Sequence, residues 1–235
     1  MGSQSISQTL RYIYHRLMGC YGSQHWWPAD EPFEVMVGAI LTQSAAWVNV
    51  EKAINNLKAA GMLSPRALRR LSLTELATLI RPCGYFNAKA RKLKAPAEWL
   101  GQAYSNDPDN IGATSLRELR LQLLTVHGIG EETADSIILY AANKPIFVID
   151  AYTRRIIDRI GLAPRCSRGN SYSAYQSLFM ENLPHRTALF NEYHALLVHH
   201  GKKVCRQRPL CPECCLKDIC QFGTKSPLSL ARKGG

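Results

Sequence analysis

The stretch that decides the fold is VHGIGEETADSII, residues 126–138, which places a glycine turn between two helical patterns. Leucines in residues 116–125 and small or apolar residues in 131–142 recur at the three- and four-residue spacing of a helix face. Gly128 and Gly130 permit positive φ angles and carry no Cβ, so a phosphate can approach the backbone amides where the second helix begins. The pattern predicts a turn that holds a nucleic-acid backbone, or, more simply, an ordinary helix–helix turn.

Helical patterns also dominate the rest of the 235-residue chain. Strand signals are few, Ser64-Pro65 and Ser72 indicate helix starts, and glycines such as Gly201 indicate stops. The sequence therefore predicts an all-α protein, built as one domain or two compact lobes. The expected helices cover residues 5–17, 32–41, 46–59, 65–71, 73–81, 85–103, 116–125, 131–142, 151–160, 172–182 and 187–201.

The chain is strongly basic, with 29 Lys and Arg against 18 Asp and Glu, a formal net charge of +11 and a pI of about 9.4. Such an excess favours a polyanionic partner. The cationic run at residues 89–94 is expected to contact backbone phosphates, to form a solvated helix face, or to do both. Because no signal peptide or membrane-spanning pattern is present, we expect a cytoplasmic protein associated with the chromosome.

After the glycines, residues 145–155 read PIFVIDAYTRR, with Asp150 at a helix start. The hairpin, its second helix and this aspartate resemble the helix-hairpin-helix DNA glycosylases of the endonuclease III group, and the likeness extends over about residues 33–220. The resemblance implies a two-lobed all-α fold, double-stranded DNA with damaged bases as partner, and a monomer. It places a six-helix barrel at 30–144 and an iron–sulfur cluster lobe at 1–29 plus 145–223. Residues 224–235 are basic, small and glycine-ended, so we expect a disordered tail there.

The resemblance also assigns a role to Asp150, which would stabilise the positive charge that develops on the sugar and help to activate water. A fixed carboxylate suits this step, because breaking an N-glycosidic bond builds oxocarbenium-like charge. An isolated Asp followed by Ala-Tyr-Thr is more simply a helix N-cap, and both roles can be filled at once.

Position 132 holds Glu132, where bifunctional relatives carry a lysine that attacks the sugar and forms a Schiff base. Glutamate cannot form that imine. The resemblance therefore implies a monofunctional glycosylase that uses water and leaves an abasic site. Taken by itself, an acid in the first turn of a helix is simply favoured by the helix dipole.

Four cysteines near the C-terminus have the spacing C-x5-C-x2-C-x5-C, which is typical of a metal site: Cys205, Cys211, Cys214 and Cys220. The spacing alone is compatible with tetrahedral zinc or an iron–sulfur cluster. The resemblance implies a four-iron, four-sulfur cluster, although the first gap is one residue shorter than in the family. We favour the cluster over zinc, with disulfides third. Cations around the first cysteine, Lys202, Lys203 and Arg206, are expected to contact DNA phosphates.

The N-terminal part offers candidates for recognition of the damaged base. Gln43 matches the family glutamine that fills the gap left by a flipped nucleotide, and Gly128, Ile129 and Gly130 would hold the backbone. Three tryptophans, together with Glu132, resemble the 3-methyladenine-specific branch, in which aromatic rings enclose the base: Trp26, Trp27 and Trp47. Rings of this kind attract a cationic alkylated purine through cation–π contact, and they also serve as ordinary packing.

The sequence thus favours excision of alkylated purines, chiefly 3-methyladenine with 7-methylguanine second. The first alternative is a glycosylase for a neutral base, such as uracil, mismatched thymine or hypoxanthine, whose pocket would need polar groups that read the base edge. The second is a cluster-containing DNA-binding protein without catalysis, against which Asp150 argues.

Overall fold

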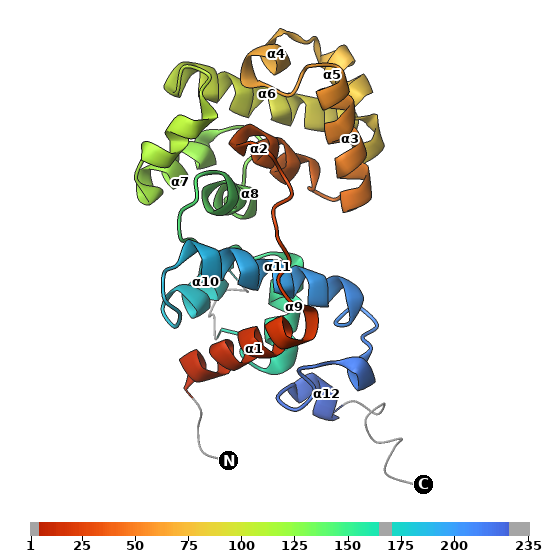
Figure 1. Cartoon of the computed structure of the whole chain (residues 1–235), viewed down its shortest axis with the longest axis vertical. Helices are drawn as coiled ribbons and strands as arrows, with labels where there is room; N and C mark the ends of the chain where they lie inside the picture. Colours follow the sequence, from red (N-terminus) through yellow and green to blue (C-terminus); the bar gives the residue numbers. More distant parts are fainter. Residues whose placement is uncertain (1–4, 165–170, 226–235) are drawn as a thin grey trace. The chain divides into compact units, whose positions relative to one another are not determined.

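In the computed structural model, described over residues 5–164 and 171–225, the chain is helical and contains no strand within those ranges (Figure 1). It divides into two compact units. The hairpin unit comprises residues 27–144, and the cysteine unit comprises residues 1–26 together with 145–235. No helix in the described part of the chain is long and apolar enough to cross a bilayer.

The hairpin unit is built around α2, whose residues 33–41 are all buried. Helix α2 packs against α3, α6 and the segment η3, and α6 packs against α4 and α5. Serine caps begin α4, α5 and α7, and Ser72 forms a capping box with Glu75, so local sequence sets these helix starts. The elements are α2 (Pro32–Leu41), α3 (Trp47–Ala59), α4 (Pro65–Arg70), α5 (Leu73–Leu79), η1 (Arg81–Cys83), α6 (Phe86–Ala103), η2 (Pro108–Ala113), α7 (Leu116–Thr125), α8 (Glu131–Ser136) and η3 (Ile137–Ala141).

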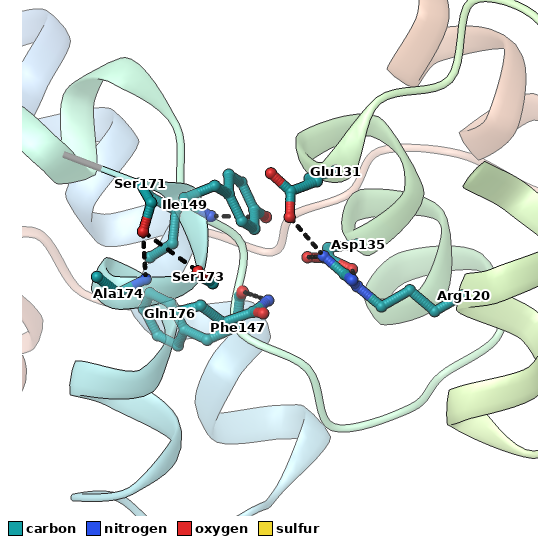
Figure 2. Close-up of polar contacts among 10 residues, drawn as sticks. Arg120, Glu131, Asp135, Phe147, Ile149, Ser171, Ser173, Ala174 and Gln176 are labelled. Carbon is teal, nitrogen blue, oxygen red and sulfur yellow. Dashed lines mark hydrogen bonds and ion pairs between the residues drawn. The ribbon is translucent and has the colours of Figure 1, made fainter. Parts of the chain in front are cut away.

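The cysteine unit packs α11 against α1 and α9. Its core is aromatic: the rings of Phe147 and Phe179 stack with centroids 3.8 Å apart, and Phe190 and Tyr193 meet Phe147 edge-on. Figure 2 shows Gln176 beside Phe147, whose carbonyl accepts a 2.8 Å hydrogen bond from the Gln176 amide. The elements are α1 (Ile6–Tyr21), α9 (Ala151–Ile160), α10 (Tyr172–Met180), α11 (Thr187–Lys203), η4 (Cys211–Glu213) and α12 (Gln221–Lys225).

Several features differ from the sequence prediction, and the first is that α1 runs to Tyr21 rather than ending at residue 17. The expected helix 131–142 is an α-helix only to Ser136 and continues as a π-helix over Ile137–Ala141. Helix α11 passes through Gly201, which is needed for space, since a Cβ there would lie 2.6 Å from Tyr152 Cδ1. Helix α12 includes Thr224 and Lys225, the first two residues of the predicted disordered tail, and residues 226–235 lie outside the described ranges.

Candidate functional site

The glycine turn joins α7 to α8 as a tight hairpin. Gly128 has φ +84°, a conformation that glycine adopts readily. A Cβ on Gly128 would also lie 2.4 Å from Lys92 Cγ, so the residue needs to be small as well. Ile129 is 6% exposed and anchors the turn in the core, while Gly130 is the N-cap of α8.

An ion pair fastens the two hairpin helices to each other, as Figure 2 shows. Arg120 on α7 donates from Nε to Asp135 Oδ1 at 2.7 Å and from Nη2 to Asp135 Oδ2 at 3.3 Å. The Asp135 side chain has no exposed area, and Glu131 lies 3.4 Å from the same guanidinium. Hydrogen bonding to Asp135 raises the pKa of Arg120, although burial opposes the shift. The turn is therefore held by two helices that are locked together.

Gln43, in the turn between α2 and α3, is bonded within the hairpin unit. Its Nε2 donates to the Gly128 carbonyl at 3.0 Å and to Thr133 Oγ1 at 3.1 Å. Its Oε1 accepts from Lys92 Nζ at 2.6 Å. The structure therefore joins two segments, Gln43 and the glycine hairpin, that are more than eighty residues apart in sequence.

Two lysines of the cationic run at residues 89–94 are bonded within the hairpin unit. Lys89 is 3% exposed, and its ammonium donates to the carbonyls of Leu41 and Cys83, both at 2.9 Å. Lys94 donates to the carbonyls of Arg69 and Leu71. These lysines therefore bond the ends of neighbouring elements to α6. For these two lysines the expectation of a solvated face is wrong, because charge pattern alone does not reveal acceptors that the fold brings close, whereas Arg91 of the same run is exposed.

Two of the three candidate tryptophans meet in the hairpin unit. Trp27 and Trp47 pack edge to face with centroids 5.5 Å apart, and Tyr140 lies 5.3 Å from Trp27. Trp27 lies against α2 so closely that a Cβ on Gly38 would be 3.0 Å from its ring. Trp26 is partly exposed and is the last residue of the first stretch of the cysteine unit.

Tyr140 is a member of this cluster that sequence reasoning missed. It lies in the π-helix, and such segments are frequent at functional sites because they redirect side chains within a helix. Glu132 is exposed in the first turn of α8, where its carbonyl accepts from Ser136 Oγ at 2.7 Å.

Asp150 is the N-cap of α9 in the cysteine unit. Its Oδ1 accepts from the Thr153 amide at 2.7 Å, and its Oδ2 lies 3.9 Å from Nε2 of the buried His194. Burial lowers the pKa of His194, and Asp150 opposes that shift. Desolvation of its ammonium likewise lowers the pKa of Lys202, although the side chain as a whole is exposed, and Asp150 opposes this shift. The carboxylate is thus fixed through one oxygen, and burial disfavours the charged form of His194 beside the other oxygen.

The four cysteines are free thiols in the loop that follows α11. Arg159 Nη1 donates to Cys205 Sγ at 3.3 Å, and the Leu216 amide donates to Cys214 Sγ at 3.4 Å. Burial raises the pKa of Cys214 to about 11, and the charges of the other three cysteines add to the shift, so the four lie within electrostatic range. Free thiols with N–H donors fit a thiolate-bound metal or cluster in their chemistry.

Within the described residues, however, no three or more His, Cys, Asp or Glu side chains are arranged as ligands of a metal ion. The identity of the bound group therefore stays a prediction. The cations expected beside this loop are exposed: Lys202 and Lys203 end α11, and Arg206 follows Cys205.

Known proteins resemble this chain in sequence over most of its length. Residues 37–185 match the HhH-GPD superfamily of base excision DNA repair proteins. A proposed DNA repair glycosylase of Methanocaldococcus jannaschii is 42% identical over 210 residues, which cover 88% of this chain and 94% of that protein.

Two solved structures share the fold. An endonuclease III–DNA complex has a TM-score of 0.78 at 22% identity and covers 94% of this chain and 98% of its own. The 3-methyladenine DNA glycosylase of H. pylori, bound to 1,N6-ethenoadenine, has a TM-score of 0.71 at 22% identity and covers 85% and 98%.

Proposed function

Because the chain belongs to the HhH-GPD superfamily of base excision DNA repair proteins, we propose that it is a monofunctional DNA glycosylase for alkylated purines. Its main substrate is 3-methyladenine, with 7-methylguanine second, and its product is an abasic site in double-stranded DNA.

The aromatic cluster of the hairpin unit carries the choice of substrate. Trp27, Trp47 and Tyr140 bring three electron-rich rings together, with adjacent centroids 5.3 and 5.5 Å apart. A purine alkylated at N3 or N7 is cationic, and a desolvated cation–π contact contributes about 2 kcal/mol in addition to stacking. These terms offset the few kcal/mol, roughly, that extrusion of the nucleotide costs. We expect Trp26 to contact the same base. The fold that the chain shares with the H. pylori 3-methyladenine DNA glycosylase is compatible with an alkylated purine as substrate.

The absence of lyase activity rests on Glu132. Glutamate has no amine to form a Schiff base with the sugar, so the reaction stops at the abasic site. Its carboxylate, exposed on α8, adds attraction for a cationic base.

Asp150 supplies the electrostatic part of the reaction. With one oxygen fixed by the Thr153 amide, its carboxylate presents a preorganised negative charge to the sugar cation. An alkylated base is already a good leaving group and needs little acid assistance. The main tasks are therefore to recognise the base and to stabilise the sugar cation, which then takes up water.

The cysteine loop has a structural role in this proposal. Cys205, Cys211, Cys214 and Cys220 would hold a four-iron, four-sulfur cluster, which fixes the loop when bound. Nearby cations Lys202, Lys203 and Arg206 then face DNA phosphates, while the hairpin residues Gly128, Ile129 and Gly130 hold the backbone elsewhere.

The test is excision from matched duplexes that carry methylated purines, uracil or hypoxanthine, with and without alkali. We expect release of 3-methyladenine, with strand breaks only after alkali. An Asp150→Asn variant should lose about two orders of magnitude or more in rate and still bind DNA, because it removes the charge but keeps the shape. Release of only neutral bases would overturn the substrate assignment, and breaks without alkali would overturn the role of Glu132.

A further inference from the structure

One face of helix α1 holds part of the cysteine loop that follows α11. Tyr12, Arg16 and Cys20 recur every four residues, so their side chains lie along one face of the helix. The Tyr12 hydroxyl donates to Asp218 Oδ2, and Arg16 Nη2 lies 3.9 Å from Asp218 Oδ1. Arg16 also donates from Nε and Nη2 to the Cys215 carbonyl, at 3.1 and 2.9 Å. This face of α1 is therefore fixed against the loop.

The third residue of that face, Cys20, places its thiol beside the thiol of Cys215. The two thiols are hydrogen-bond partners, and the Tyr21 hydroxyl bonds to Cys215 as well. Cys20 is exposed, whereas Cys215 is half-buried. Both are free thiols, and neither belongs to the four cysteines whose spacing is typical of a metal site. The contact therefore joins two thiols that the proposed cluster does not use.

We propose that Cys20 and Cys215 form a peroxide-sensitive modification site, at which hydrogen peroxide converts the two thiols into a disulfide. In the first step the Cys20 thiolate attacks one oxygen of the peroxide, which gives a sulfenic acid and releases hydroxide. In the second step the Cys215 sulfur displaces the hydroxyl group of that sulfenic acid, and the Cys215 proton leaves with it as water. Two thiols and one peroxide thus give one disulfide and two waters.

The order of the two steps follows from the surroundings of each sulfur. Cys20 is exposed and meets the oxidant first. Burial raises the pKa of Cys215 to about 12, and the neighbouring Cys20 adds to the shift, so Cys215 enters the reaction as a thiol. A protonated thiol is a weak nucleophile, but one that already touches the sulfenic acid needs no diffusion to reach it. This chemistry does not depend on the proposed function as a DNA glycosylase.

The test is to treat the protein as purified with one equivalent of hydrogen peroxide, to alkylate the remaining thiols, and to digest with trypsin without reductant. Mass spectrometry should find a disulfide that joins residues 17–52 to residues 207–217. The second peptide also contains Cys211 and Cys214, so variants assign the bond. We expect the linked pair to disappear in Cys20→Ser and in Cys215→Ser. The matched control is Cys83→Ser, which removes a buried cysteine of the hairpin unit and should link like the wild type.

Arg16→Met tests whether α1 positions the two thiols. It removes both donors to the Cys215 carbonyl, so we expect the linked fraction at the same peroxide dose to fall by about threefold or more. The matched control is Arg11→Met, which removes an exposed cation of the same helix and should leave the linked fraction unchanged.

Thermal unfolding provides a second readout, because a disulfide between α1 and the loop restricts the unfolded chain. Peroxide-treated wild type should unfold about 5 °C or more above peroxide-treated Cys20→Ser, and the difference should vanish when dithiothreitol is added. The treated variant also corrects for any other damage that the oxidant causes.

Either of two results would overturn the proposal. A link that forms at the wild-type yield in Cys215→Ser would show that Cys20 joins one of the four proposed ligand cysteines instead. Cys20 recovered as a sulfinic acid, or still alkylated at a peroxide dose that oxidises other cysteines, would show that the two thiols do not close a disulfide.

Discussion

The ion pair between Arg120 and Asp135 leads to an asymmetric prediction for stability. The Asp135 side chain is wholly buried, whereas that of Arg120 keeps 24% of its surface exposed and has Glu131 as a second partner. Arg120→Met therefore leaves a buried carboxylate without its bidentate donor, while Asp135→Asn leaves a cation that water and Glu131 can still reach. Removing one partner of a buried pair costs about 3–5 kcal/mol when the charge that remains is the buried one.

We expect Arg120→Met to lose about 3–5 kcal/mol in the free energy of unfolding measured by urea titration. The corresponding fall in Tm is about 6–20 °C for a chain of this size. Asp135→Asn should lose about 1–2 kcal/mol, because an amide still accepts a hydrogen bond from the guanidinium.

The pH dependence of Arg120→Met provides a second measurement. Without the guanidinium, burial should raise the folded-state pKa of Asp135 above its unfolded value, so the folded variant binds the proton more tightly. Its deficit relative to the wild type should then be full above that raised pKa and shrink as the pH falls through it. Equal losses for the two variants, or a loss below about 1 kcal/mol for Arg120→Met, would refute the argument from burial.

Three further predictions concern other parts of the chain. Burial lowers the pKa of His194 from 6.5, so the unfolded state protonates this imidazole before the folded state does as the pH falls. The free energy of unfolding of the wild type should therefore decline below pH 6.5. His194→Gln should flatten that part of the curve of unfolding free energy against pH. Cys211→Ser should lower bound iron and weaken DNA binding without changing which base is released, as iron analysis and anisotropy would show; unchanged iron content would contradict the ligand assignment. Gly128 has φ +84°, and a Cβ there would clash with Lys92, so Gly128→Ala should lower the free energy of unfolding by about 1–2 kcal/mol from the backbone alone. The variant should also bind any duplex more weakly, as urea unfolding and a filter-binding assay would measure. A neutral effect would mean that the hairpin can adopt another conformation.

Much of the fold could be predicted because its signals are local. Helices α2, α7 and α9 begin and end where apolar spacing, caps and glycines predict, at Pro32–Leu41, Leu116–Thr125 and Ala151–Ile160. The π-helix could not be predicted, since no proline or glycine marks Ile137–Ala141, and the helix α2 against which it packs is about a hundred residues away in sequence. Gly201 was wrongly predicted to end a helix. The ring of Tyr152, which leaves no room for a Cβ at position 201, is about fifty residues away in sequence.

The candidate site shows the same division. The family resemblance identified Trp27 and Trp47 as candidates, but only the fold brings Tyr140 beside Trp27. Asp150 was expected to cap a helix from its local sequence, whereas the buried His194 at 3.9 Å comes from a helix whose contact with α9 is tertiary. Chemistry that depends on residue type and short spacing is visible in a sequence, and chemistry that depends on distant neighbours is not.

The formal charge of +11 overstates how much of the chain can contact DNA. Lys89 and Lys94 bond to backbone carbonyls inside the hairpin unit, and Arg120 is committed to Asp135. In the cysteine unit, Arg155 donates to the carbonyls of Cys205 and Gly201 at 2.8 and 2.9 Å. Cations bonded in this way cannot release counterions from a duplex unless those bonds break. The salt dependence of binding should therefore reflect fewer ions than the number of lysines and arginines in the chain. Basic composition indicates the class of partner, and the internally bonded cations limit how many phosphates are held.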